Sequence, residues 1–263
     1  MNNVLDFARF KAEGRKISIV TAYDAWSARL VARSNVDAVL VGDSAAMVMH
    51  GHDTTLGATV SLMALHTRAV ARSAAGKFVI ADMPFLSFRK GIPEGMSAVA
   101  RLVSSGAQAV KLEGVDGHED LVRQIVESGV PVMGHVGLTP QSVHQFGGFR
   151  VQGKSADDAA RVVRQAHTLE DLGCFAIVLE CIPADLAARI TCELRCPTIG
   201  IGAGAGTDGQ VLVLQDLWGV DSTRVPRFVR RYVDGERVLT TALDEFDADV
   251  KTARFPGPEE SYS

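Results

Sequence analysis

A short apolar segment that ends in an acid constrains this chain more than any other feature. Residues 38–41 read AVLV, with no polar residue among them, and Gly42 and Asp43 follow directly. An uninterrupted apolar run of this length is typical of a strand that is buried on both faces. Gly42 allows the backbone to bend, so the strand is expected to end by presenting the Asp43 carboxylate, with the Ser44 hydroxyl beside it.

The same pattern, an apolar run that ends in a polar group, recurs along the chain. KFVIAD ends at Asp82, AQAVKLE at Glu113, PVMGH at His135 and CFAIVLE at Glu180. One strand, one helix and their loops occupy about 30 residues, and the polar strand ends recur at a similar spacing. Polar groups at the carboxyl ends of parallel strands meet on one face of a barrel or sheet. The sequence therefore predicts one site built from the ends of several strands.

Apolar runs and amphipathic segments alternate, which predicts alternating strands and helices. Strands are expected at 17–21, 38–41, 78–81, 109–112, 132–134, 176–179 and 198–201. Helices are expected at 4–12, 26–33, 61–75, 96–105, 118–128, 156–172 and 183–192, the last with Pro183 at its first position. Loops are expected at 45–57, 85–95 and 137–154. The eighth unit is the least clear: 211–217 is apolar, 228–232 is the next plausible element, and the tail from residue 248 is expected to be extended or frayed.

Length and charge narrow the fold and the partners. The chain has 263 residues, near the about 250 of a (β/α)8 barrel, so we expect one barrel domain over 1–263 with a short N-terminal helix and a polar C-terminal tail. The net charge of −4, without a basic block, argues against nucleic acid and anionic membrane as partners. No apolar run approaches a membrane span, and the N-terminus is too polar for a secretion signal. A cytoplasmic protein is the expectation.

Three other motifs have a structural explanation. Cys192 and Cys196 are four residues apart, but Pro197 follows and no further His or Cys completes a metal site, so the four cysteines are interpreted as structural thiols in a reducing compartment. Residues 204–209 match GxGxxG after a late strand rather than the first, which makes a dinucleotide site improbable. His50 and His52 lack the further ligands that zinc needs.

Asp43, Asp82 and Glu113 together suggest a metal ion. Three carboxylates at one barrel mouth would repel one another unless a divalent cation lies among them. Ligation by oxygen alone favours Mg²⁺ over Zn²⁺. The alternative is that each acid caps the helix after its strand, but three acids in phase favour the metal.

The other polar strand ends suggest binding and proton transfer. Lys111 lies two residues before Glu113 and so on the same face; it could bind a substrate carboxylate, form a Schiff base or make a structural ion pair. A metal makes the Schiff base redundant, so binding is favoured. Glu180 suits a general base with a pKa raised by burial, or a capping acid before Pro183. His135 remains open between a structural and a functional role.

Ordered blocks of sequence resemble the ketopantoate hydroxymethyltransferase family. The blocks are VTAYD at 20–24, LVGDS at 40–44, GHDTTL at 51–56, ADMPF at 81–85, VKLEG at 110–114, GHVGLTPQS at 134–142, GGFRVQGK at 147–154, VLEC at 178–181 and IGIGAGAGTDGQ at 199–210. They follow in order over most of the chain. The resemblance implies a (β/α)8 barrel of the phosphoenolpyruvate mutase and isocitrate lyase group, a Mg²⁺ cofactor and a large homo-oligomer, often a decamer.

The resemblance also implies a reaction. A hydroxymethyl group passes from the co-substrate 5,10-methylenetetrahydrofolate to 3-methyl-2-oxobutanoate, and the product, 2-dehydropantoate, leads to pantothenate. By matching motif, the implied metal ligands are Asp43, Asp82 and, directly or through water, Glu113. The implied substrate-binding residues are Asp43, Ser44, Asp82, Lys111 and His135. The implied base that removes a proton is Glu180.

Some positions differ from the usual family pattern. They are Ala45 and Ala46 after the serine, Gly57 and Ala58 after Leu56, and Gln215 before Asp216. None removes a predicted ligand or the base. They leave open an altered substrate preference. Two other functions also remain possible: a related Mg²⁺-dependent 2-oxo acid lyase, and a non-catalytic paralogue that serves as a binding or assembly subunit.

Overall fold

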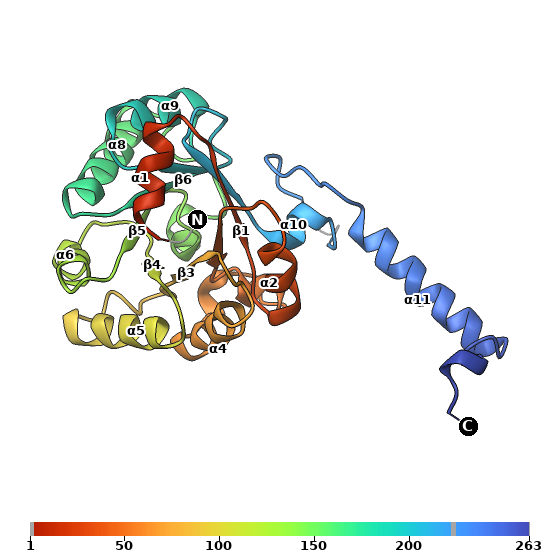
Figure 1. Cartoon of the computed structure of the whole chain (residues 1–263). Helices are drawn as coiled ribbons and strands as arrows, with labels where there is room; N and C mark the ends of the chain where they lie inside the picture. Colours follow the sequence, from red (N-terminus) through yellow and green to blue (C-terminus); the bar gives the residue numbers. More distant parts are fainter. Residues whose placement is uncertain (1–2, 222–224, 263) are drawn as a thin grey trace. The chain divides into compact units, whose positions relative to one another are not determined.

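The structure, a computed structural model, describes residues 3–221 and 225–262. Its strands form a closed parallel barrel, with helices between successive strands (Figure 1). The strands follow one another in chain order, and the last pairs with the first. They are β1 (Ile17–Thr21), β2 (Ala38–Val41), β3 (Phe78–Asp82), β4 (Ala109–Lys111), β5 (Val132–Gly137), β6 (Ala176–Glu180), β7 (Thr198–Ile201) and β8 (Gly209–Leu212). This topology confirms the predicted (β/α)8 barrel.

Helices alternate with these strands, as the sequence pattern predicts. They are α1 (Leu5–Ala12), α2 (Ala25–Ala32), α3 (Ala45–Val48), α4 (Val60–Ala71), α5 (Ile92–Ser104), α6 (Glu119–Glu127), α7 (Val143–Phe146), α8 (Ala156–Asp171), α9 (Ala184–Glu193), α10 (Leu214–Trp218) and α11 (Gly235–Lys251). Short 3₁₀ turns are η1 (Thr55–Gly57), η2 (Pro140–Ser142) and η3 (Pro258–Glu260). No helix among the described residues is both long enough and apolar enough to cross a bilayer.

The chain divides into two compact units, Met1–Val213 with the barrel strands and Leu214–Ser263. A single domain over residues 1–263 stays a prediction. In the second unit, the expectation of an extended tail from residue 248 is wrong, because α11 continues to Lys251 and η3 follows. Residues 228–232, expected to be an element, form neither helix nor strand.

The predicted loops contain more helix than expected. The loop predicted at 85–95 is shorter, because α5 already begins at Ile92 with Pro93 in its first turn. A proline is tolerated there, since the first N–H groups of a helix have no partner inside the helix. The loops at 45–57 and 137–154 contain α3 with η1, and η2 with α7. Pro183 is the N-cap of α9 rather than its first residue.

The glycine-rich segment before β8 closes the barrel. A Cβ atom on Gly209 would meet the carbonyl oxygen of Ile17 at 2.4 Å, and these two residues are register partners of β8 and β1. Only glycine permits so close an approach of two backbones. The last glycine of the GxGxxG match is therefore explained by strand packing.

Alternation along the strands places the polar groups inside the barrel mouth. The apolar core includes Phe78 and Ile80 of β3, and Ala176 and Val178 of β6, all inside the closed barrel. Side chains two residues apart on a strand share a face. Asp82 lies two residues after Ile80, and Glu180 lies two residues after Val178, so both acids face the barrel interior. By the same spacing, Lys111 follows Ala109 on β4 and His135 follows Met133 on β5. At the opposite end, α1 packs Phe7 against Phe78 and Phe175, with ring centroids 5.7 and 4.9 Å apart.

We predict that Gly137 is essential for the junction of β5 and β6. It has φ +96°, and a Cβ there would lie 2.3 Å from the carbonyl oxygen of Glu180. Gly137→Ala should therefore lower the free energy of unfolding by roughly 2–4 kcal/mol in urea titrations. Gly129→Ala is the matched control, because Gly129 has φ +85° but open space around its Cβ position; its loss should be about 1 kcal/mol. Equal losses would contradict the steric explanation.

Candidate active site

A buried ion pair lies at the carboxyl ends of β3 and β4. The Lys111 ammonium is 2.6 Å from Asp82 Oδ1, and both side chains are almost completely buried. The other oxygen, Asp82 Oδ2, accepts a hydrogen bond of 3.0 Å from the backbone N–H of Asp43. A Cβ atom on Gly42 would lie 2.7 Å from Ser44 Oγ, so glycine at this position leaves room for the Ser44 hydroxyl. Asp82 thus joins the ends of β2, β3 and β4.

Lys111 keeps its charge because carboxylates surround it. Burial alone would lower the pKa of Lys111, but the charges of Asp82, Glu113 and Asp43 raise it above its ordinary value. The ammonium therefore stays protonated at neutral pH.

Gln141, in η2, connects the other two predicted metal ligands. Its side-chain Nε2 donates to Asp43 Oδ2 at 2.8 Å, and its backbone N–H donates to Glu113 Oε2 at 2.9 Å. Gln141 has no role in the sequence interpretation, although it lies in the block GHVGLTPQS. A glutamine in a predicted loop carried no signal of its own. Only the path of the chain after β5 brings it over the barrel mouth.

The carboxyl groups in this region are hard to ionise. Burial and, secondly, the charge of Asp82 raise the pKa of Asp43 to about 7. Burial and the charge of Asp43 raise the pKa of Glu113 well above its usual value. The charge of Asp43 thus makes it harder for Glu113 to lose its proton. A proton or a cation must therefore compensate the charge.

Glu180 and His135 form the other part of the site. His135 Nε2 lies 3.2 Å from Glu180 Oε2, and His135 Nδ1 lies 3.7 Å from Glu113 Oε1. Burial and the charge of Lys111 lower the pKa of His135 well below its usual value, so the ring is neutral and these are not ion pairs. Within residues 3–221 and 225–262 neither ring nitrogen makes a well-oriented hydrogen bond. Burial also raises the pKa of Glu180 to about 8.

Ser44 is held by Tyr23, which, like Gln141, has no assigned role in the sequence interpretation. The Tyr23 hydroxyl shares a hydrogen bond of 2.8 Å with Ser44 Oγ. The backbone carbonyl of Tyr23 accepts a hydrogen bond of 2.5 Å from His66 Nδ1. His66 Nε2 in turn lies 2.8 Å from His50 Nε2. Of the two loop histidines, His50 and His52, His50 therefore has a structural partner in His66.

The donor chemistry of the predicted metal ligands suits a divalent cation. Asp43 and Glu113 are buried acids with raised pKa values, and the charge of Asp43 contributes to the raised pKa of Glu113. The Gln141 Oε1 oxygen is buried and lacks a hydrogen-bond partner among the described residues. In the part of the chain that the structure describes, no three His, Cys, Asp or Glu side chains already form a metal-binding group. The three-carboxylate ligand set thus stays a prediction.

The remaining sequence features lie outside this cluster. Ala45 and Ala46 are fully buried in α3, directly after Ser44. Gln215 belongs to the second unit. The cysteines, all within the described residues, are free thiols, as expected. Cys181, directly after Glu180, has φ +46°.

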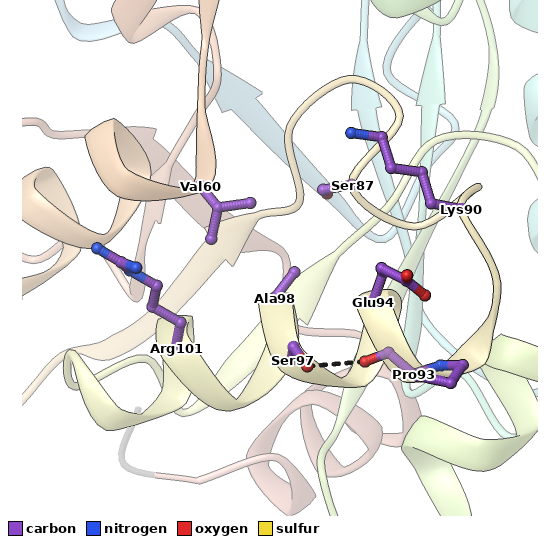
Figure 2. A pocket seen from close by; sticks show the side chains of 8 residues that line it. All are labelled: Val60, Ser87, Lys90, Pro93, Glu94, Ser97, Ala98 and Arg101. Carbon is purple, nitrogen blue, oxygen red and sulfur yellow. Dashed lines mark hydrogen bonds between the residues drawn. The ribbon is translucent and has the colours of Figure 1, made fainter.

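A separate hollow lies beside the β3–α5 connection (Figure 2). It has a volume of about 460 Å³ and is lined by Val60, Ser87, Lys90, Pro93, Glu94, Ser97, Ala98 and Arg101. Figure 2 shows Lys90 and Glu94 near one end and Arg101 with Val60 near the other. None of the predicted site residues is among those that line it, so it is distinct from the carboxylate cluster.

We predict that the metal-free protein becomes less stable between pH 5 and pH 8. The raised pKa values mean that folded Asp43, Glu113 and Glu180 keep protons that the unfolded chain has released. Their contribution is present below the ordinary carboxyl pKa and is lost as pH rises through the folded values. Thermal midpoints in EDTA should therefore fall from pH 5 to pH 8, less steeply in Asp43→Asn. Identical slopes in the two proteins would refute this account.

Comparison with known proteins agrees with the geometry. A family model described as ketopantoate hydroxymethyltransferase matches residues 2–258. A protein of Bdellovibrio bacteriovorus named 3-methyl-2-oxobutanoate hydroxymethyltransferase is 53% identical over 263 residues, with 100% of both chains covered. A protein of the same name from Coxiella burnetii is 52% identical over 255 residues, which cover 97% of this chain and 96% of the relative.

Solved structures share the fold at low sequence identity. A phosphonopyruvate hydrolase in complex with oxalate and Mg²⁺ has a TM-score of 0.63 and 13% identity, covering 99% of this chain and 93% of its own. A 2,3-dimethylmalate lyase of the PEP mutase/isocitrate lyase superfamily has a TM-score of 0.60 and 16% identity, covering 100% and 92%. These likenesses confirm the barrel fold. With the family match and the two relatives, they lead to one assignment: the chain belongs to the ketopantoate hydroxymethyltransferase family.

Proposed function

We propose that this enzyme transfers a hydroxymethyl group from 5,10-methylenetetrahydrofolate to 3-methyl-2-oxobutanoate, giving 2-dehydropantoate in the cytoplasm. The observation that carries the proposal is the full-length match, at 53% identity, to a relative named for this activity. The strand ends support it with chemistry of the right kind. The acid Glu180 is influenced by the charges of Lys111 and Asp82, and the buried carboxyl groups of Asp43 and Glu113 lie at the neighbouring strand ends.

Glu180 is the proposed base. The C3 hydrogen of the keto acid must leave as a proton before carbon–carbon bond formation, and a carboxylate with a pKa of about 8 binds that proton well. The neutral His135 ring beside Glu180 adds no competing positive charge. The resulting carbanion equivalent attacks the one-carbon unit of the folate. Water supplies the hydroxyl oxygen, and tetrahydrofolate leaves.

Lys111 and Ser44 are the proposed contacts to the keto acid. The Lys111 ammonium stays charged and fixed by Asp82 at 2.6 Å, so it can attract the substrate carboxylate without moving far. The Ser44 hydroxyl is oriented by Tyr23 at 2.8 Å. Burial raises the pKa of the Tyr23 phenol, which therefore keeps its proton and can donate. Groups held in this way lose little freedom when the substrate binds.

Asp43, Asp82 and Glu113 are the proposed ligands of Mg²⁺. The proposal is supported by their burial, their oxygen donors and the pKa values of Asp43 and Glu113, which a nearby cation would lower. When bound, the metal would supply Lewis-acid polarisation of the substrate carbonyl.

A homo-oligomer, with a decamer as the specific expectation, is also proposed. On α11 the apolar side chains Val238, Leu239, Leu243, Phe246 and Val250 are 48–67% exposed. Such a row of apolar side chains is unfavourable in water, so it supports burial against another protein surface.

We predict that Glu180→Gln nearly abolishes the first chemical step. NMR in D₂O would follow exchange of the C3 hydrogen of 3-methyl-2-oxobutanoate, and we expect a loss of about 10²–10⁴-fold. Glu127→Gln, at an exposed acid of α6, is the control and should exchange normally. Full exchange in the Glu180 variant would exclude this base. Failure of the folded wild type to exchange, even with tetrahydrofolate present, would favour a non-catalytic paralogue or another keto acid.

We also predict that removal of divalent metal stops the exchange. EDTA should reduce the rate by at least about tenfold, because the carbonyl then lacks Lewis-acid polarisation, and excess Mg²⁺ should restore it. Asp43→Asn should raise the Mg²⁺ concentration needed for half-maximal exchange. Exchange that is indifferent to EDTA would count against the metal, while product formation without methylenetetrahydrofolate would favour the lyase alternative.

A further inference from the structure

Gln141 contacts three strand ends at once. Its side-chain Nε2 donates one hydrogen to Asp43 Oδ2 at 2.8 Å and the other to the Met83 carbonyl at 3.0 Å. Its backbone N–H donates to Glu113 Oε2 at 2.9 Å. Asp43 follows β2, Met83 follows β3, and Glu113 follows β4. The residue is 7% exposed, so all of these contacts are shielded from water.

The orientation of the Gln141 amide is determined by its partners. One Nε2 hydrogen points at the Met83 backbone carbonyl, which can only accept, and the other points at the carboxyl oxygen Asp43 Oδ2. A flipped amide would place Oε1 against the same two oxygens and would lose both hydrogen bonds. Buried polar groups strongly favour the hydrogen-bonded arrangement. Gln141 is therefore a rigid donor pair rather than an adaptable side chain.

These bonds also decide which carboxylate oxygens stay available. Asp43 Oδ2 and Glu113 Oε2 are each occupied by a Gln141 hydrogen. The Gln141 hydrogen bonds leave Asp43 Oδ1 and Glu113 Oε1 unused, and Glu113 Oε1 lies 3.7 Å from His135 Nδ1. Each acid thus keeps one oxygen for another partner while the other is held in place.

We propose that Gln141 is a positioning residue for the divalent cation: by holding one oxygen of Asp43 and one of Glu113, it presents the remaining oxygens as ligands. The inference rests on the metal site of the proposed function and adds a residue to which neither the sequence interpretation nor the family comparison gives a role. Groups that hydrogen-bond to metal ligands orient them, and their loss typically weakens metal binding about 10–100-fold.

The position of Gln141 follows from the local sequence. Gly137, with φ +96°, turns the chain at the end of β5, and the Leu138 N–H then donates to the Glu180 carbonyl at 2.9 Å. Pro140 starts η2, and the Ser142 N–H donates to the Thr139 carbonyl at 2.8 Å. This tight turn directs the backbone N–H of Gln141 towards β4 and its side chain towards β2.

The test measures metal affinity rather than activity. Gln141→Met keeps the approximate shape and the backbone N–H but removes the side-chain donors. Mn²⁺ titration followed by electron paramagnetic resonance should show a dissociation constant raised about 10–100-fold. Gln165→Met is the matched control: Gln165 is also 7% exposed, and its Nε2 donates to the carboxylate of Asp116 at 2.6 Å, outside the proposed ligand set. The control should bind Mn²⁺ as the wild type does.

Each outcome decides between the possibilities. Wild-type Mn²⁺ affinity in folded Gln141→Met, or an equal loss in both variants, would overturn the inference and leave the proposed function intact. Absence of Mn²⁺ binding by the wild type would instead overturn the metal site itself. Thermal midpoints in EDTA report folding separately from binding. If Gln141→Met does not fold, Gln141→Asn takes its place; its shorter amide should also weaken binding, and unchanged affinity would again refute the role.

Discussion

The buried Lys111–Asp82 pair is the interaction on which the site depends. Separated by 2.6 Å and almost fully shielded from water, the two charges compensate each other at the mouth of the barrel. Removal of one partner from such a pair costs about 3–5 kcal/mol, because the other is left uncompensated. Asp82 also receives the Asp43 backbone N–H. The pair therefore anchors the mouth of the barrel while Lys111 serves as the local positive charge.

Around this pair the acids outnumber the cations, and that imbalance gives the site its chemistry. Asp43, Glu113 and Glu180 all have raised pKa values, with burial as the largest cause. Two of them, Asp43 and Glu113, are tied by Gln141 and have an oxygen to spare, which suits a cation. Glu180 stands beside a neutral histidine, which suits proton transfer. The same buried environment thus suits both cation binding and proton transfer, and the neighbours of each carboxyl group determine which of the two it suits.

Sequence reasoning predicted the bounds of an element correctly where the residues of that element alone determine them. The strands 17–21, 38–41 and 198–201 have the predicted bounds, because apolar runs of that length have few other solutions in a barrel. The prediction of element bounds failed where contacts outside the local sequence determine the structure. Helix α5 begins earlier than expected because Pro93 starts the helix rather than interrupting it. Helix α11 was missed because its apolar residues are exposed and interleaved with charges, which resembles a polar tail.

The sequence by itself determined the barrel, the inward rows and the identity of the polar strand ends, because alternation along a strand is a local property of the backbone. It could also place Asp43, Asp82, Lys111, Glu113, His135 and Glu180 at one mouth. Only the tertiary structure decided which atoms meet. The pairing of Lys111 with Asp82, the proximity of His135 to Glu180 and the bridge through Gln141 depend on strand register and on the turn after β5. Contacts between residues far apart in the chain leave no pattern in a single sequence.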